Sequence, residues 1–225
     1  MSDASLEREL RARWAADVGR RPGADQALTA LLARHREPVR RYHTAVHVAR
    51  VLREAQRLAD AVDLPGAAAR GVRLAAWFHD AVYDPRAPAG ANEAASAALA
   101  GRVLAEMGEP EGGCAEVQRL VLLTAGHEPA PGDAAGAVLI DADLAVLTAD
   151  PAAYQAYVDG VRSEYAHVDD AAWRTGRAAV LRSFLERPAL FRVPVDAGRD
   201  ARARANLRAE LARLDPPSPA SVVVP

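Results

Sequence analysis

Three apolar segments of the sequence each carry a pair of side chains that can bind a metal or move a proton. In RRYHTAVHV, WFHDAVYD and LIDADLAVL, the pairs are His43 with His47, His79 with Asp80, and Asp141 with Asp143. A charged carboxylate in apolar surroundings is costly unless it is paired or bound to a metal. Imidazole and carboxylate form a ligand set without sulfur, which suits Mn²⁺, Fe²⁺, Zn²⁺ or Co²⁺ and, more weakly, Mg²⁺. One divalent ion bound by all three segments would offset the cost of placing these polar and charged side chains in apolar surroundings.

Each pair also has a purely structural interpretation. A histidine near a core is usually held by a hydrogen bond, and aspartates often cap helices. The coincidence of three such pairs in three apolar segments favours the metal site. A helix that includes both His43 and His47 places them on one face, because they are four residues apart. A helix through LIDADLAVL turns Asp141 and Asp143 about 200° apart, so only one of them can face the metal.

Helical periodicity runs through nearly the whole sequence and supplies the elements that must position these pairs. The first predicted helix carries Leu6, Leu10, Trp14 and Val18, and the next five cover about 25–35, 44–62, 66–78, 92–107 and 114–125. The segment AVLIDADLAVL is predicted to form a short helix. Two further helices are capped by Asp150 and by Asp169 or Asp170, and the last covers about 196–214. No strand alternation, repeat or linker is visible. The sequence therefore predicts an all-α, single-domain helical bundle over 1–214 and a disordered tail over 215–225.

Composition limits the classes of protein to consider. The chain has 225 residues, half of them hydrophobic, which is enough for one ordinary domain with a core. A net charge of −2 excludes a strongly basic protein that depends on nucleic-acid backbone. Cys114 is the only cysteine, so no intramolecular disulfide can form. The N-terminus is charged and no apolar run reaches the ~20 residues of a membrane span. We therefore expect a cytoplasmic protein without membrane contact or stable nucleic-acid binding.

The order of these residues resembles a known signature. His47, then His79 with Asp80, then Asp143 resembles the H…HD…D signature of the HD superfamily of metal-dependent phosphohydrolases. The segments YHTAVHV, WFHDAVYDP, NEAASA and DADLAVL are similar to a bacterial branch described as predicted HD-domain hydrolases, over roughly residues 42–185. The resemblance implies an HD-type bundle with its metal-site core in that range. It also implies one divalent ion (Mn, Co, Ni, Fe, Zn or Mg) held by the four signature residues.

The resemblance also separates the two aspartates and gives His43 a role. Asp143 is favoured over Asp141, because the last aspartate of the family usually follows alanine and precedes an apolar residue. His43 resembles the first histidine of the HNxxH box of the related cyclic nucleotide phosphodiesterases, where that histidine protonates the leaving group. Thr44 stands where that box has asparagine.

His127 and Glu93 are further candidates. Members of the superfamily with two metals use extra histidines between the HD pair and the last aspartate, and His127 is the single candidate there. The resemblance therefore implies one metal, with His127 in contact with substrate phosphate or the attacking water. Glu93, in ANEAAS, is predicted to be the general base or to hold a ligand histidine in its tautomer. Glu93 also has a structural interpretation, since the helix dipole favours an acidic residue in a first turn.

Arginines near the motifs are candidates for binding substrate phosphate. All 28 basic residues are arginine, and a guanidinium can hold phosphate through two parallel hydrogen bonds. Arg40 and Arg41 precede YH, Arg86 follows YDP, and Arg162 lies in VRSEY. Of the adjacent pair, Arg41 is favoured because it adjoins the histidines. Asp84, before a proline, is predicted to close a turn rather than to bind metal.

The activity implied by the resemblance is hydrolysis of a small phosphate ester or anhydride, such as a nucleotide, by a metal-activated water. His43, when protonated, would donate to the leaving oxygen. Two alternatives stay open. A catalytically silent HD module could sense a nucleotide, although such a module has little need of all four ligands. An HD-type di-iron oxygenase needs six histidine and carboxylate ligands, where about five are visible. The expected partner is a small phosphorylated molecule, and homo-oligomer formation is left open.

Overall fold

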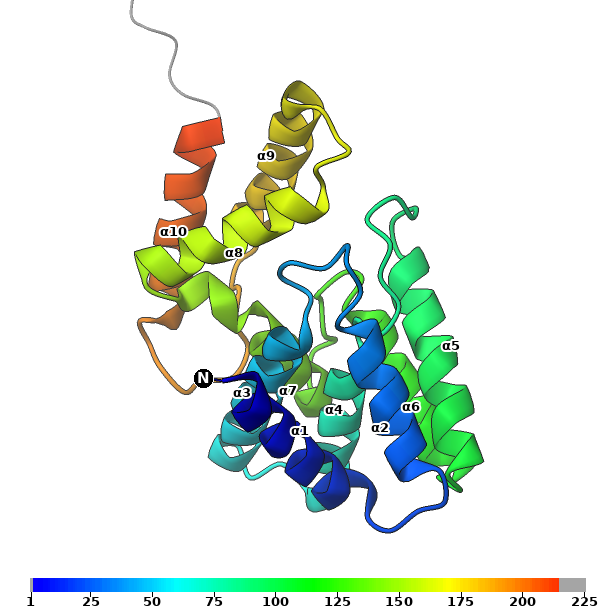
Figure 1. Cartoon of the computed structure of the whole chain (residues 1–225). Helices are drawn as coiled ribbons and strands as arrows, with labels where there is room; N and C mark the ends of the chain where they lie inside the picture. The colour runs from blue at the N-terminus through cyan, green and yellow to red at the C-terminus, as the bar shows by residue number, and fades with distance from the viewer. Residues whose placement is uncertain (1, 215–225) are drawn as a thin grey trace, which may run out of the picture. The chain divides into compact units, whose positions relative to one another are not determined.

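A computed structural model of the chain describes residues 2–214. These residues contain ten α-helices (Figure 1). They are α1 (Asp3–Val18), α2 (Ala24–Arg34), α3 (Ala45–Ala61), α4 (Gly66–Phe78), α5 (Ala91–Glu106), α6 (Glu111–Leu123), α7 (Ala134–Asp143), α8 (Pro151–Glu164), α9 (Asp170–Glu186) and α10 (Arg199–Leu214). A 3₁₀ helix, Leu144–Thr148, follows α7, so AVLIDADLAVL is not one α-helix throughout. Residues 2–214 contain no strand, which confirms the all-α prediction. The predicted disordered tail lies outside the described residues.

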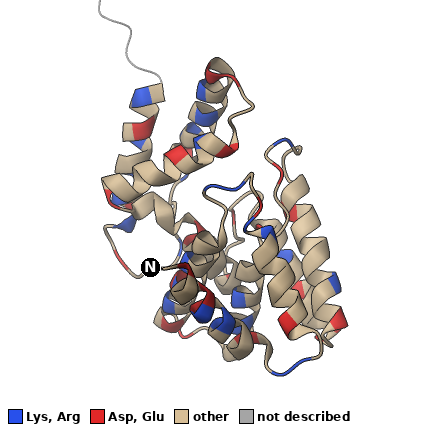
Figure 2. Cartoon of the chain, viewed as in Figure 1, with Lys and Arg blue, Asp and Glu red and all other residues tan. Residues whose placement is uncertain are grey.

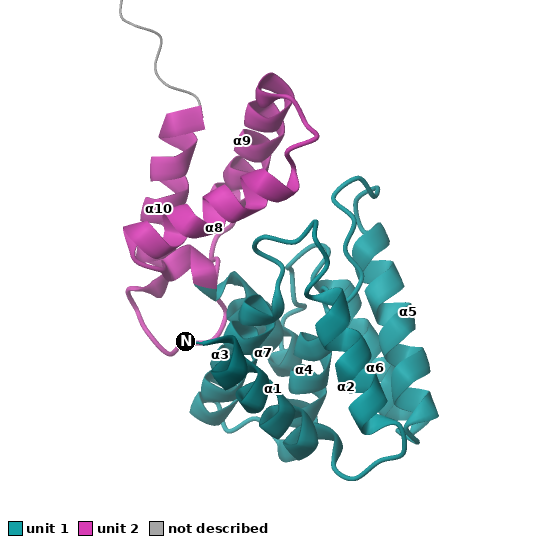
Figure 3. Ribbon diagram, in the orientation of Figure 1, with its two compact units in different colours: residues 1–145 teal, residues 146–225 magenta. Residues whose placement is uncertain are grey.

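The chain divides into two compact units, residues 1–145 and 146–225 (Figure 3). Helices α1 to α7 belong to the first unit, and α8 to α10 belong to the second. The prediction of a single domain over 1–214, with a metal-site core over 42–185, stays a prediction.

Helix α4 lies at the centre of the first unit, where it packs against α3, α5, α6 and α7. Its buried side chains occupy most of its circumference: Ala69, Val72, Leu74, Ala75, Ala76, Trp77 and Phe78. A helix that is apolar nearly all round belongs in a core. Small alanine side chains at helix contacts let neighbouring backbones approach closely. Burial of α4 therefore carries the two residues at its C-terminal end, His79 and Asp80, into the interior.

The C-terminal half of α4 is fixed to α1 through Asp17. The Trp77 indole N–H donates to one carboxylate oxygen of Asp17 (3.1 Å), and Arg73 donates to the other (2.6 Å). Trp14 meets Trp77 edge to face, with ring centroids 5.2 Å apart. Asp17 is buried, but both of its oxygens are satisfied, as a buried carboxylate requires. These contacts set the position of the residues that follow Trp77.

In the second unit, side chains from α8, α9 and α10 meet at the buried carboxylate of Glu210. Tyr154 donates its hydroxyl to one oxygen (2.6 Å), and Arg177 donates to the other (2.7 Å). Burial and the neighbouring Glu210 raise the pKa of Tyr154, which keeps the phenol a neutral donor. The predicted caps are present, since Asp150 and Asp169 accept backbone N–H groups at the starts of α8 and α9.

Charged side chains of both signs are interspersed along the helices of each unit (Figure 2). Many pair at helical spacing, for example Arg11 with Glu7 and Arg57 with Glu54. Such exposed pairs contribute only about 0.3–0.5 kcal/mol each, so the core carries most of the stability. Within residues 2–214, no helix combines the length and the apolar character that a membrane span requires.

Candidate metal centre

The four predicted ligands come from the ends of three helices of the first unit. His47 lies in the first turn of α3, His79 ends α4 and is followed by Asp80, and Asp143 is the last residue of α7. The three helices pack against one another. Packing of apolar helix faces therefore assembles side chains that are far apart in the sequence. We call these four residues the His–Asp cluster.

The nitrogen and oxygen atoms of the His–Asp cluster lie within a few ångströms of one another. The Nε2 atoms of His47 and His79 are 3.0 Å apart. Asp80 Oδ2 lies 3.3 Å from the His47 Nε2 atom and 3.0 Å from the His79 Nε2 atom. Asp143 Oδ1 lies 3.2 Å and 3.6 Å from the same two nitrogens. Ligand atoms of His47, His79 and Asp80 all lie within 4.8 Å of one another, which makes them a group that could hold a metal ion.

The separations among His47, His79 and Asp80, and those from Asp143 to the two histidines, fit one small divalent cation. With metal–ligand distances of about 2.1 Å, neighbouring ligand atoms are about 3.0 Å apart in octahedral geometry and about 3.4 Å apart in tetrahedral geometry. The measured separations run from 3.0 Å to 3.6 Å. Two imidazoles and two carboxylates also form a donor set that suits such an ion.

His79 is held in the tautomer that a metal ligand needs. Its Nδ1 lies 2.9 Å from the carbonyl oxygen of Ala76, one turn earlier in α4. A carbonyl oxygen can only accept, so Nδ1 carries the proton, and the Nε2 of the neutral ring presents its lone pair to the cluster. The helix itself therefore orients the ring.

The charges of the His–Asp cluster shift the pKa of every member. Burial lowers the pKa of His47 and His79, but Asp80 and Asp143 outweigh it, so both histidine pKa values are raised, that of His79 well above its usual range. Burial likewise raises the pKa of Asp80 and Asp143, but the histidines outweigh it and hold both well below their usual range. Two ionised carboxylates in the interior thus require positive charge beside them, as protons on the imidazoles or as a metal ion.

His127 reaches the cluster through Asp143. Its Nε2 lies 3.1 Å from Asp143 Oδ2, whereas Asp143 Oδ1 is the oxygen near the two buried histidines. His127 follows α6 in the left-handed conformation (φ +52°), and its backbone N–H donates to the Leu123 carbonyl (3.0 Å). A single left-handed residue ends many helices, and histidine tolerates this conformation better than bulky or branched residues do. The predicted contact of His127 with substrate or water stays a prediction.

His43 lies outside α3, as the predicted bounds of about 44–62 imply, so His43 and His47 do not share one helix face. Thr44 is the extended N-cap residue, and α3 begins one residue later. His43 instead packs its ring against Tyr83, with centroids 4.4 Å apart, and its centroid lies 5.9 Å from that of His47. Positive charge on His43 also helps to lower the pKa of Asp80. A loop, rather than a helix, therefore brings His43 to the cluster.

Arg40 joins this loop to the turn that carries Asp80. Its fully buried guanidinium donates to the carbonyl oxygens of His43 (3.0 Å), Asp80 (2.8 Å) and Ala81 (3.3 Å), and it pairs with Glu37 (3.1 Å). The sequence indicates Arg40 only as one of several arginines for phosphate. Every residue has a backbone carbonyl, so the sequence does not show which carbonyl oxygens Arg40 binds.

Helix α5 holds the same turn through two residues of NEAASA. The buried Ser96 hydroxyl accepts the Val82 N–H (3.0 Å) and donates to the Val82 carbonyl (3.3 Å). One turn earlier, Asn92 accepts the Asp84 N–H and donates to the Asp84 carbonyl, both at 3.0 Å. The Asp84 side chain accepts the Arg86 N–H (2.9 Å), which confirms that Asp84 closes a turn.

Glu93 takes no part in these contacts among the described residues, and Asp141 lies on another side of α7 from Asp143. Glu93 lies in the first turn of α5, and no hydrogen bond or ion pair within residues 2–214 joins it to the His–Asp cluster. Asp141 is fully buried in α7, two residues before Asp143, which turns it about 200° around the helix axis. Asp143 is the aspartate that lies within reach of three histidines.

Arg41 and Arg86, two of the predicted phosphate-binding arginines, lie in the first unit, and Arg162 lies in the second. Arg41 donates to the carbonyl oxygens of Pro38 (2.6 Å) and Arg40 (2.9 Å), and Arg86 is exposed at the turn after Asp84. Arg162 belongs to the second unit, where it donates to two carbonyl oxygens after α8 and to a carboxylate of α9. Their role in substrate binding stays a prediction.

Comparison of the chain with protein-family models, with curated proteins and with solved structures gave no match. The functional interpretation therefore depends on the geometry of the His–Asp cluster and on the resemblance of its sequence segments.

Proposed function

We propose that the protein is a metal-dependent phosphohydrolase that acts on a small phosphate ester or anhydride, such as a nucleotide. The convergence of His47, His79 and Asp80, at separations that fit a single divalent ion, is the observation that carries this proposal, and Asp143 lies beside the same two histidines. When bound, such an ion lowers the pKa of a water molecule and neutralises charge that develops on a phosphoryl oxygen.

His43 is the proton donor in this proposal. Its ring lies between those of Tyr42 and Tyr83, at centroid distances of 5.0 Å and 4.4 Å, beside the cluster. Its charged form interacts favourably with Asp80. A half-buried imidazolium in this position can protonate the oxygen of a leaving group. The tyrosine rings restrict its motion, which keeps the proton directed at the site.

The proton of the attacking water goes to a carboxylate at the metal centre. Asp143 is one candidate, because its Oδ2 lies on the side of His127 (3.1 Å), away from His47 and His79, which lie near Oδ1. Glu93 is the alternative acceptor that the resemblance suggests, although it makes no hydrogen bond to the cluster within the described residues. His127 therefore acts by orienting Asp143 and by holding it ionised.

The substrate phosphate is proposed to meet arginine, since the chain has no lysine. Arg41 and Arg86 are exposed in the first unit, near the loop and the turn that carry His43 and Asp80. Arg162 is the third candidate, although its guanidinium already holds the end of α8.

Phosphate release across a panel of nucleotides tests the proposal. The panel comprises nucleoside mono-, di- and triphosphates, cyclic nucleotides and guanosine alarmones, each assayed with Mn²⁺, Co²⁺, Ni²⁺ or Mg²⁺. We expect release of phosphate from at least one compound, only with metal. Thermal stabilisation by a nucleotide without product would instead indicate a silent sensor. Bound iron together with oxygen uptake would indicate an oxygenase.

A further inference from the structure

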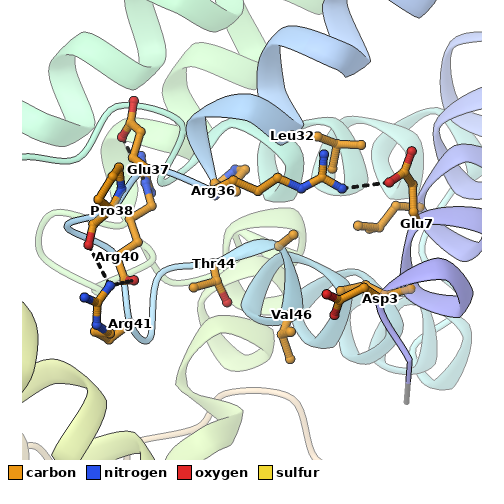
Figure 4. A pocket seen from close by; sticks show the side chains of 14 residues that line it. Asp3, Glu7, Leu32, Arg36, Glu37, Pro38, Arg40, Arg41, Thr44 and Val46 are labelled. Carbon is orange, nitrogen blue, oxygen red and sulfur yellow. Dashed lines mark hydrogen bonds and ion pairs between the residues drawn. The ribbon is translucent and has the colours of Figure 1, made fainter.

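A cavity of about 390 Å³ lies in the first unit, between α1, the end of α2 and the loop that leads into α3 (Figure 4). This volume is near the lower end of the range of about 300–1,000 Å³ for small-molecule sites. Leu6, Leu10 and Leu32 contribute apolar surface, and Thr44 and Val46 contribute the start of α3. None of the four residues of the His–Asp cluster lines it, so the cavity is separate from the proposed metal centre.

His35 lines this cavity and has no hydrogen-bond partner. The residue is 2% exposed, and both of its ring nitrogens are buried without a partner among the described residues. The His43 carbonyl, which accepts from Arg40 (3.0 Å), lies near the His35 ring and acts to raise its pKa. Burial and the positive charge of Arg40 lower the pKa of His35 to about 3, so the ring is neutral at physiological pH. Buried polar groups are nearly always paired, and an exception requires an explanation.

The first turn of α3 faces the same cavity without a cap. The Thr44 side chain makes no capping hydrogen bond, and no acidic residue lies in the first turn. The backbone N–H groups of Ala45 and Val46, both lining residues, make no hydrogen bond within residues 2–214. The N-terminus of a helix carries partial positive charge and directs its free N–H groups at anions. The turn is therefore a site for a negatively charged group.

The charged side chains around the cavity largely neutralise one another. Arg36 pairs with Glu7 (2.7 Å), across the cavity from Thr44 and Val46 in Figure 4, and Arg40 pairs with Glu37. Asp3 and Arg41, which also line the cavity, add one negative and one positive charge. Such a lining does not attract a multiply charged phosphate. It suits a singly charged group attached to an apolar body.

We infer that this cavity is a second ligand site, which binds a small carboxylate with an apolar body. The carboxylate accepts the N–H groups of Ala45 and Val46, and the body packs against the leucines. His35 donates to an oxygen of the ligand and so gains the partner that it lacks. This site is separate from the His–Asp cluster, because the two share no residue, although Arg41 lines the cavity and is also a candidate for binding substrate phosphate.

Binding measurements on the full chain test this inference. The probes are octanoate, phenylacetate and indole-3-acetate, with inorganic phosphate as the competing anion, and the readouts are calorimetry and backbone amide shifts. Val46→Asp places a negative charge in the first turn, where the helix dipole favours it, so the variant should fold well and repel an anion. Val46→Asn is the neutral control, and Val46 is 41% exposed, so both changes are tolerated. His35→Phe removes the unpaired nitrogens and should raise the Tm.

We expect at least one carboxylate to bind one to one and to shift the amides of Ala45 and Val46. Val46→Asp should weaken this binding about tenfold or more relative to Val46→Asn, and His35→Phe should weaken it while raising the Tm. Failure of all three carboxylates to bind, binding of phosphate alone, or equal affinity in the two Val46 variants would overturn the inference. Phosphate release plays no part in these measurements, so their outcome is independent of the proposed enzymatic activity.

Discussion

The Nε2 atoms of His47 and His79 lie 3.0 Å apart in the interior of the first unit. The Nδ1 of His79 donates to a backbone carbonyl, so the lone pair of its Nε2 is directed at the other ring when His79 is neutral. Two ionised carboxylates adjoin the same nitrogens. Positive charge between these groups stabilises the arrangement, and either protons on the imidazoles or the divalent ion of the proposed function can supply it.

Metal uptake is expected to release protons and to weaken as the pH falls. The pKa values of His47 and His79 are raised above the ordinary 6.5, so the metal-free protein retains protons that the metal must displace. The apparent metal affinity should therefore rise with pH until both pKa values are passed. Calorimetry in two buffers of different ionisation enthalpy, at about pH 6 and about pH 8, counts the protons. Metal binding without proton release at either pH would contradict the expectation.

The stability of the metal-free protein should depend on pH through the same four groups. The raised histidine pKa values stabilise the fold fully below 6.5, and this stabilisation is lost as the pH rises through the folded-state values. The lowered pKa values of Asp80 and Asp143 stabilise it above 3.8, and that part is lost as the pH falls through their folded-state values. Bound metal replaces the protons, so the gain in Tm on adding metal should widen above about pH 6.5. A constant gain across this range would argue against the cluster as the metal site.

Replacement of His127 should weaken metal binding without unfolding the protein. His127→Asn keeps a side chain that tolerates φ +52° but removes the hydrogen bond to Asp143 Oδ2. Loss of a group that orients a ligand typically costs about 10–100-fold in metal affinity. His127→Gly serves as a second variant, since it relaxes the backbone and removes the same bond. Wild-type metal affinity in both variants would show that Asp143 needs no support from His127.

Replacement of Arg40 should disturb the cluster through the backbone. Arg40→Lys keeps the charge but cannot donate to the carbonyls of His43, Asp80 and Ala81 together. Each buried carbonyl left without a donor costs about 1–3 kcal/mol, so the free energy of unfolding should fall by at least about 2 kcal/mol. We also expect about tenfold weaker metal binding. The neighbouring exposed change Arg41→Lys is the control, and it should alter neither property.

Much of the fold was predictable, because apolar residues at helical spacing face the core of each unit. The stripe of α3 and the nearly all-apolar α4 are examples, and their burial explains why the His–Asp pair at the end of α4 is internal. Asp84 was predictable as a turn residue, because the proline after it prevents continuation of a helix. The helix argument also limited the choice between Asp141 and Asp143 to one of the two.

The parts that the sequence did not predict depend on the backbone. Periodicity does not mark the extended Thr44 that leaves His43 in a loop, nor the left-handed His127. The buried Arg40 binds carbonyl oxygens, which every residue carries, so its targets are invisible in a sequence. The unpaired His35 is likewise defined only by what surrounds it in three dimensions.

Metal content and phosphate release, compared between wild type, Asp80→Asn and Asp84→Asn, test the central claim most directly. Asn at position 84 can still accept the Arg86 N–H, so this variant should behave as wild type. Asp80→Asn should remain helical but bind metal more than about 100-fold more weakly, since it removes a charged ligand. We predict that wild type binds one equivalent of metal, loses phosphate release on depletion and regains it on metal addition. Metal-depleted wild type that releases phosphate as fast as the loaded protein would contradict the account.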